Sequence, residues 1–110
     1  MLKDTISQIE AKLQDSAALK PEQREELLRL LATLKSEVAG LSKTDAEQAR
    51  SIAGYTEVSA HEATRERKNE PLLEHSLEGL RTSVNGFEKS HPRLVDIVNR
   101  IATMLSNLGI

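Results

Sequence analysis

The chain has 110 residues, a length that corresponds to one domain or to a thin assembly of helices. Hydrophobic residues make up 38% of the sequence and aromatic residues only 2%, so leucine, isoleucine, valine and alanine must build the core. The net charge of −2 is too close to balance to attract nucleic acid or an anionic membrane by charge alone.

The chain has no cysteine, which excludes disulfides, thiolate metal sites and thiol catalysis. Charges at Lys3, Asp4 and Glu10 interrupt the N-terminal stretch where a signal peptide would need an apolar core. No apolar run approaches the roughly 18 residues of a membrane-spanning helix. The sequence therefore predicts a soluble, cytoplasmic protein with no integral membrane segment.

Apolar residues recur at steps of three and four along the chain, a pattern that predicts amphipathic helices. The first predicted helix covers residues 2–15 and has a narrow apolar stripe. The second covers residues 21–39 and begins at Pro21, where a missing N–H does no harm. Lys20 before it is a poor capping residue because its side chain offers no acceptor.

A third helix is predicted over residues 45–68, where the Thr-Asp-Ala-Glu run at 44–47 fits a capping box. Its apolar face consists mostly of alanine, which buries little area per turn, so we expect this helix to be marginal alone. The charged run at 65–70 carries both signs and is typical of a solvated helix end. Whether this helix continues the second one as a single rod stays open.

The densest apolar seam lies in the C-terminal part, where we predict helices over residues 71–89 and 92–108. The heptad pattern passes through Pro92 unbroken, so one kinked helix is an alternative. We favour a chain reversal, since proline inside a helix costs about 3 kcal/mol. The seam, expected to be the centre of the fold, comprises Leu73, Leu77, Leu80, Val84, Phe87, Leu94, Val98, Ile101, Leu105 and Leu108.

These patterns together predict an all-α fold with four to five helices in one domain, residues 1–110. We expect antiparallel helical hairpins with coiled-coil-like packing. The many apolar seams also indicate self-association, at first guess as a dimer, because so thin a chain is not expected to cover them all.

Small residues form a second line along the predicted fourth helix, in which Gly79 and Gly86 are spaced by seven. Glycine inside a helix costs about 1 kcal/mol relative to alanine, so two glycines suggest a packing reason. We hypothesise that this small face packs closely against the alanine face of the third helix, within the chain or across a dimer. The alternative is that the glycines face water.

Two stretches resemble a known family. One is KPEQREELLRLLATL, and the other contains Phe87-Glu88-x-Ser90-His91-Pro92 and ends in Asn-Leu-Gly-Ile. They resemble the bacterial domain of unknown function 4404 family, over about residues 2–38 and 72–110, with 41–70 as an apparent insertion. The resemblance implies a small bacterial helical protein, and it brings no catalytic residues because the family has no assigned activity.

Metal or small-ligand binding is the alternative function. Glu57 and His61 are four residues apart on one predicted helix, and His75 follows on the next, so these side chains are candidate ligands. A di-iron bundle needs two Glu-x-x-His motifs, whereas Glu88-x-x-His91 occurs once. The more ordinary interpretation puts His61 and His75 on solvated faces and His91 in a turn.

No catalytic motif is recognised. No serine lies in G-x-S-x-G or S-x-x-K, and no glycine-rich loop precedes a helix, so we expect neither an enzyme nor a cofactor. Basic stripes and stacking aromatics, which nucleic-acid binding uses, are missing. The sequence therefore predicts a non-enzymatic interaction or scaffold protein that self-associates.

Overall fold

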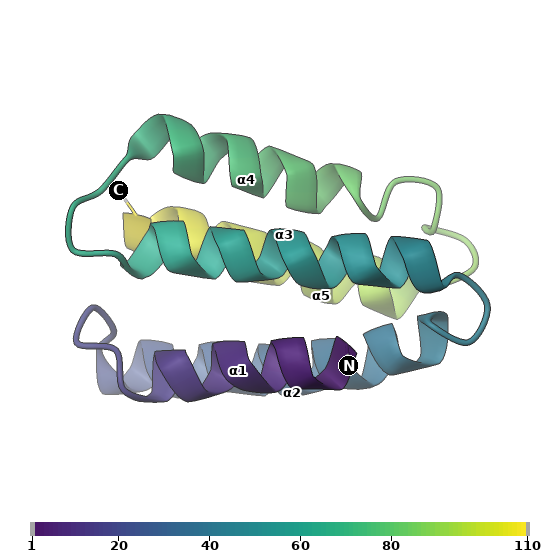
Figure 1. Cartoon of the computed structure of the whole chain (residues 1–110), viewed down its shortest axis with the longest axis horizontal. Coiled ribbons are helices and arrows are strands. Elements are labelled where there is room, and N and C mark those ends of the chain that lie inside the picture. The colour runs from purple at the N-terminus through teal and green to yellow at the C-terminus, as the bar shows by residue number, and fades with distance from the viewer. Residues whose placement is uncertain (1, 110) are drawn as a thin grey trace.

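The computed structural model describes residues 2–109, and their side chains from residue 4 onward. Successive helices run in opposite directions, as the colour order in Figure 1 shows. No strand occurs within the described residues, so the predicted all-α fold of helical hairpins is confirmed. The helices are α1 (Leu2–Gln14), α2 (Pro21–Leu41), α3 (Ala46–Thr64), α4 (Glu70–Thr82) and α5 (Pro92–Gly109).

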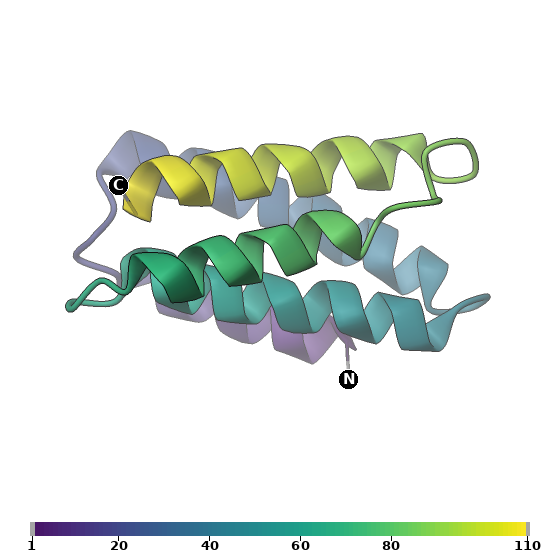
Figure 2. The ribbon, with the colours of Figure 1, turned by 90° about the horizontal axis from the view of Figure 1, so that it is seen from above.

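Helices α1, α2, α3 and α5 form a bundle. α4 packs against α3 and α5 on the outer side of this bundle (Figures 1 and 2). α3 contacts all four other helices, whereas α5 contacts α2, α3 and α4. We expected the C-terminal seam to be the centre of the fold. α3, the helix that we expected to be marginal, is just as central. None of the described helices is both long and apolar enough to span a membrane.

Among the described side chains, most of the apolar residues in each predicted seam are buried inside one chain, with Ala46 and Val58 of α3 as exposed exceptions. On α1, which had the narrowest stripe, Ile6 and Ile9 are at most 3% exposed, and Leu34 and Val38 of α2 are fully covered. The C-terminal seam is buried as well, except that Phe87 and Leu108 are half-buried. The expectation that the chain cannot cover its own seams was wrong, so uncovered seams give no reason for a dimer. The oligomeric state itself stays a prediction.

α3 ends at Thr64, four residues before the predicted end. Arg65 takes an extended conformation with ψ of 152°, and the Lys68 ammonium donates to the carbonyl of Ala63. Asn69 then caps α4, because its side chain accepts a hydrogen bond from the backbone N–H of Leu72 at 3.1 Å. Because Asn69 already caps the next helix, α3 has to end before the predicted residue 68.

α4 ends at Thr82, seven residues before the predicted end, so Val84 and Phe87 lie in the connection rather than in a helical seam. Gly86 has a φ of +92°, which reverses the chain there, and no atom lies within 4 Å of where its Cβ would be. The prediction that Gly86 packs within a helix was wrong. This glycine is needed for backbone conformation, since residues with a side chain rarely adopt positive φ.

The Phe-Glu-x-Ser-His-Pro run of the family resemblance forms the rest of this turn. The backbone N–H of His91 donates to the carbonyl of Phe87 at 2.8 Å, and the two rings meet edge to face with centroids 5.6 Å apart. The His91 Nδ1 and the Ser90 hydroxyl are 2.9 Å apart. α5 begins at Pro92, which confirms the predicted reversal.

The start of α3 is shifted by one residue from the predicted capping box. Asp45, not Thr44, is the cap, and its carboxylate accepts from the backbone N–H of Gln48 at 3.1 Å. Residues 42–45 separate α2 from α3, so the two helices are not one rod. At the start of α2, Gln23 accepts from the backbone N–H of Lys20 at 2.9 Å, although Lys20 itself makes no side-chain cap.

Replacing Ile101 with aspartate tests the core. This side chain is 0% exposed, so the variant would bury an unpaired carboxylate. We expect the free energy of unfolding to fall by about 4 kcal/mol or more, measured by thermal and urea denaturation followed by circular dichroism. Thr103→Asp on the exposed face of the same helix is the matched control. If Ile101→Asp melts like the parent, α5 is peripheral.

Two glycine-to-alanine variants test the role of Gly86 in the chain reversal. Gly86 has a positive φ, whereas Gly54 lies inside a helix. Gly86→Ala should lower the free energy of unfolding by about 1–2 kcal/mol, because the new Cβ disfavours positive φ. Gly54→Ala, in the middle of α3 with open space around its Cβ position, should raise it by up to about 1 kcal/mol. Denaturation curves of the two variants should therefore move in opposite directions, and equal shifts would contradict this role of Gly86.

Candidate functional site

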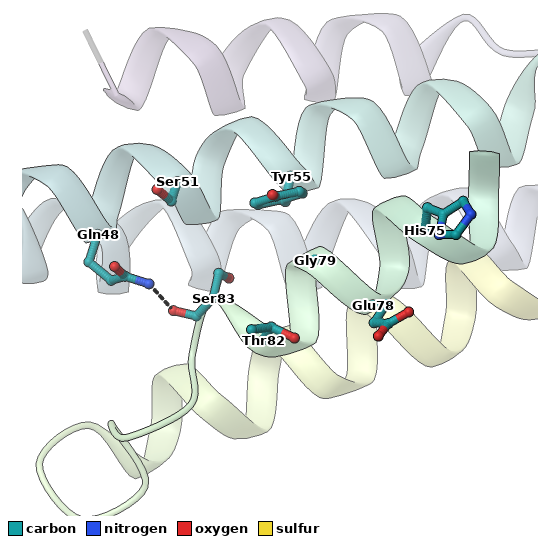
Figure 3. A pocket seen from close by; sticks show the side chains of 8 residues that line it. All are labelled: Gln48, Ser51, Tyr55, His75, Glu78, Gly79, Thr82 and Ser83. Atoms are coloured by element: carbon teal, nitrogen blue, oxygen red, sulfur yellow. Dashed lines mark hydrogen bonds between the residues drawn. The ribbon is translucent and has the colours of Figure 1, made fainter. Parts of the chain in front are cut away.

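An open groove of about 480 Å³ lies on the surface between α3 and α4 (Figure 3). Because these helices are antiparallel, the N-terminal half of α3 faces the C-terminal half of α4. Both helices contribute polar side chains to the groove walls. The lining residues are Gln48, Ser51, Tyr55, His75, Glu78, Gly79, Thr82 and Ser83.

The floor of the groove is a tyrosine that packs against a glycine. A Cβ on Gly79 would lie 2.3 Å from Cε1 of Tyr55, so only glycine leaves room for the ring against α4. Figure 3 shows Tyr55 of α3 lying toward Gly79 of α4. Tyr55 keeps 43% of its surface exposed. Gly79 thus lies at a close contact between the two helices, but its neighbour is an aromatic ring rather than the expected alanine.

One hydrogen bond ties the two walls together. The Gln48 side chain donates through Nε2 to the backbone carbonyl of Ser83 at 2.5 Å, which satisfies an acceptor just past the end of α4 (Figure 3). The Ser83 hydroxyl donates to the carbonyl of Leu80, but no hydrogen bond or ion pair within the described residues engages the other five polar side chains of the groove. Their capacity to donate and accept is therefore available to solvent or to a ligand, and these groups are Ser51, the Tyr55 hydroxyl, His75, Glu78 and Thr82.

α3, α4 and the residue that follows α4 bury small polar side chains. The hydroxyls of Thr56, Ser76 and Ser83 each donate to a carbonyl three or four residues earlier in the chain, at 2.7, 2.8 and 2.5 Å respectively. Ser59 is fully buried, and its hydroxyl has no partner within the described residues. The buried polar side chains of the described residues, Glu62 among them, thus lie on α3, on α4 or directly after α4.

The predicted metal ligands do not meet. Glu57 and His61 line a small cavity of about 60 Å³ between α1 and α3, while His75 belongs to the groove between α3 and α4. The alternative of one site built from all three residues was wrong, because they face different neighbouring helices. Across residues 2–109, no group of three histidine, aspartate or glutamate side chains is placed to hold a metal ion.

The sequence indicates Gly79 but not its partner. Taken alone, the sequence suggests that Tyr55 is a partly buried packing residue, and it does not distinguish Gln48, Ser51, Glu78 or Thr82 from other polar residues. One signal is present, since Tyr55 is the sole tyrosine on a helix whose other apolar residues are mostly small. What the sequence lacks is the register between α3 and α4, which places Tyr55 opposite Gly79.

Gly79→Leu tests the contact with Tyr55. The added side chain should displace the ring and lower the free energy of unfolding by about 1–3 kcal/mol. Gly40→Leu is the control, because nothing lies within 4 Å of its Cβ position and the change favours the helix. Tyr55 is the only tyrosine and there is no tryptophan, so intrinsic fluorescence reports the ring directly. A stable Gly79→Leu variant with parental fluorescence would contradict the packing.

A comparison with protein families matches the model described as Domain of unknown function (DUF4404) to residues 27–110. The match begins within α2 and includes all of α3, α4 and α5, so both walls of the groove lie inside it. Residues 2–26 of the expected resemblance lie outside this match, and whether residues 41–70 are an insertion stays a prediction. No curated protein and no solved structure matches the chain. The chain belongs to the DUF4404 family.

Proposed function

We propose that this chain is a non-enzymatic helical interaction protein that binds a partner protein through the α3–α4 groove. One observation carries the proposal: Tyr55 is 43% exposed over Gly79, in a groove whose polar side chains, apart from Gln48 and Ser83, have no partner in the described part of the chain. Tyrosine is enriched among the residues that anchor protein interfaces, and polar groups around such an anchor give specificity.

The exposed large apolar side chains belong to the same two helices. Among the described side chains, the large apolar ones that remain exposed are Tyr55 at 43%, Val58 at 48% and Leu72 at 47%. All three belong to α3 or α4, whereas the apolar seams of the other helices are covered.

Catalysis finds little support in this groove. Nucleophilic catalysis needs a hydroxyl that is hydrogen-bonded to a base. Ser51 and Thr82 lie in the groove with His75, but no hydrogen bond joins either hydroxyl to the imidazole in the described structure. We therefore propose recognition rather than chemistry.

Self-association, which the sequence led us to expect, would have to use this groove or another exposed face, because the seams are buried in each chain. The proposal also keeps the protein in the cytoplasm, where the absence of cysteine is usual.

Site-specific photo-crosslinking tests the proposal in the cells that make the protein. A benzophenone amino acid replaces Thr82, an exposed groove residue, and in a matched control it replaces Ser36, an exposed residue of α2. We expect discrete adducts from position 82 that position 36 does not give. An adduct of twice the chain mass would identify a second copy as the partner. Identical patterns from both positions would contradict binding at the groove.

A further inference from the structure

The helices that form the groove are the acidic part of a nearly neutral chain. α3 and α4 together carry six carboxylates against Arg50 and Arg81, a net charge of −4 in a chain whose total is −2. The remainder is therefore net positive by two. The carboxylates are Glu47, Glu57, Glu62, Glu70, Glu74 and Glu78.

These acidic groups are mostly uncompensated. Only Glu62 has an ion-pair partner within the described residues, Arg65 at 2.8 Å. The groove between α2 and α5 differs, because its Asp96 and Arg100 pair at 2.9 Å. Glu78, which lines the α3–α4 groove, is exposed and has no such partner among the described side chains.

The aromatic ring and this unpaired carboxylate line the same groove. Glu78 precedes Gly79, and Gly79 contacts the Tyr55 ring, so the carboxylate and the partly exposed ring line the same groove (Figure 3). A cation over an aromatic face is attracted by the quadrupole of the ring. A carboxylate beside such a ring adds charge attraction, and hydroxyl oxygens of Ser51 and Thr82 add acceptors.

From this arrangement we infer that the partner segment is basic, and that it places an arginine side chain against Tyr55 with its guanidinium paired to Glu78. Arginine fits better than lysine because its planar group stacks on a ring and donates several hydrogen bonds at once. A second copy of the chain fits less well, since a two-fold contact between these faces would bring two acidic surfaces together. The inference rests on the proposed function and names the chemistry of its partner.

Titration of the purified protein with short peptides tests this inference. The probes are an acetylated, amidated peptide of alternating arginine and alanine, and the same peptide with lysine or glutamate in place of arginine. Because Tyr55 is the only tyrosine and tryptophan is absent, its fluorescence reports the groove. We expect saturable binding that is tightest with arginine, weaker with lysine, absent with glutamate, and reduced by salt.

Matched variants locate the binding. Glu78→Gln should weaken binding of the arginine peptide about fivefold, the effect of one lost exposed charge pair. Glu22→Gln, on the exposed start of α2, removes the same charge and should leave binding unchanged. Tyr55→Leu, followed by calorimetry, should weaken binding about threefold. Melting curves confirm that each variant is folded.

The inference is overturned if the arginine peptide does not bind, if Glu78→Gln and Glu22→Gln weaken binding equally, or if Tyr55→Leu has no effect. Equal weakening would mean unspecific attraction to an acidic surface. If position 82 gives specific crosslinks but the arginine peptide does not bind, the proposed interaction function is supported and the inference of a basic partner is wrong. If the peptide binds but position 82 gives no specific crosslinks, the groove binds cations and the proposed protein partner is wrong.

Discussion

The close approach of α3 to its neighbours is the constraint on which the rest of this structure depends. Helix separation is set by the side chains at the contact, so a helix with a small face permits short interaxial distances. Ala49, Ala53, Ala60 and Ala63 are all at most 5% exposed, and α3 contacts every other helix. A bulkier α3 would hold its neighbours apart, and the leucine and isoleucine seams would then not close around one core.

The groove is a consequence of the same small-residue packing. At Gly79 of α4 the missing side chain leaves room for the Tyr55 ring of α3, which stays 43% exposed at the surface. The two helices that carry the exposed aromatic ring also carry most of the buried hydroxyls of the described residues.

Local rules of helix formation account for much of the fold. Periodicity indicates four to five helices, and Pro21 and Pro92 begin α2 and α5 because proline is favoured in the first turn and disfavoured in the interior. The C-terminal ends of the helices are less predictable. The heptad pattern continues through Val84 and Phe87 and so predicts a longer α4, but the chain reverses near Gly86. Periodicity does not distinguish a helical seam from a turn whose apolar residues return to the core.

The sequence by itself determined the all-α class, a count of four to five helices, the prolines at which two of them begin, and the absence of any thiol chemistry, because these depend on residues close together in the chain. Tertiary structure alone decided that α3 contacts every helix, that one chain covers most of its apolar seams, and that Tyr55 lies over Gly79 in a groove that Glu78 also lines. These features depend on the volumes and the register of helices far apart in sequence. Neither quantity is encoded in the pattern of any single helix.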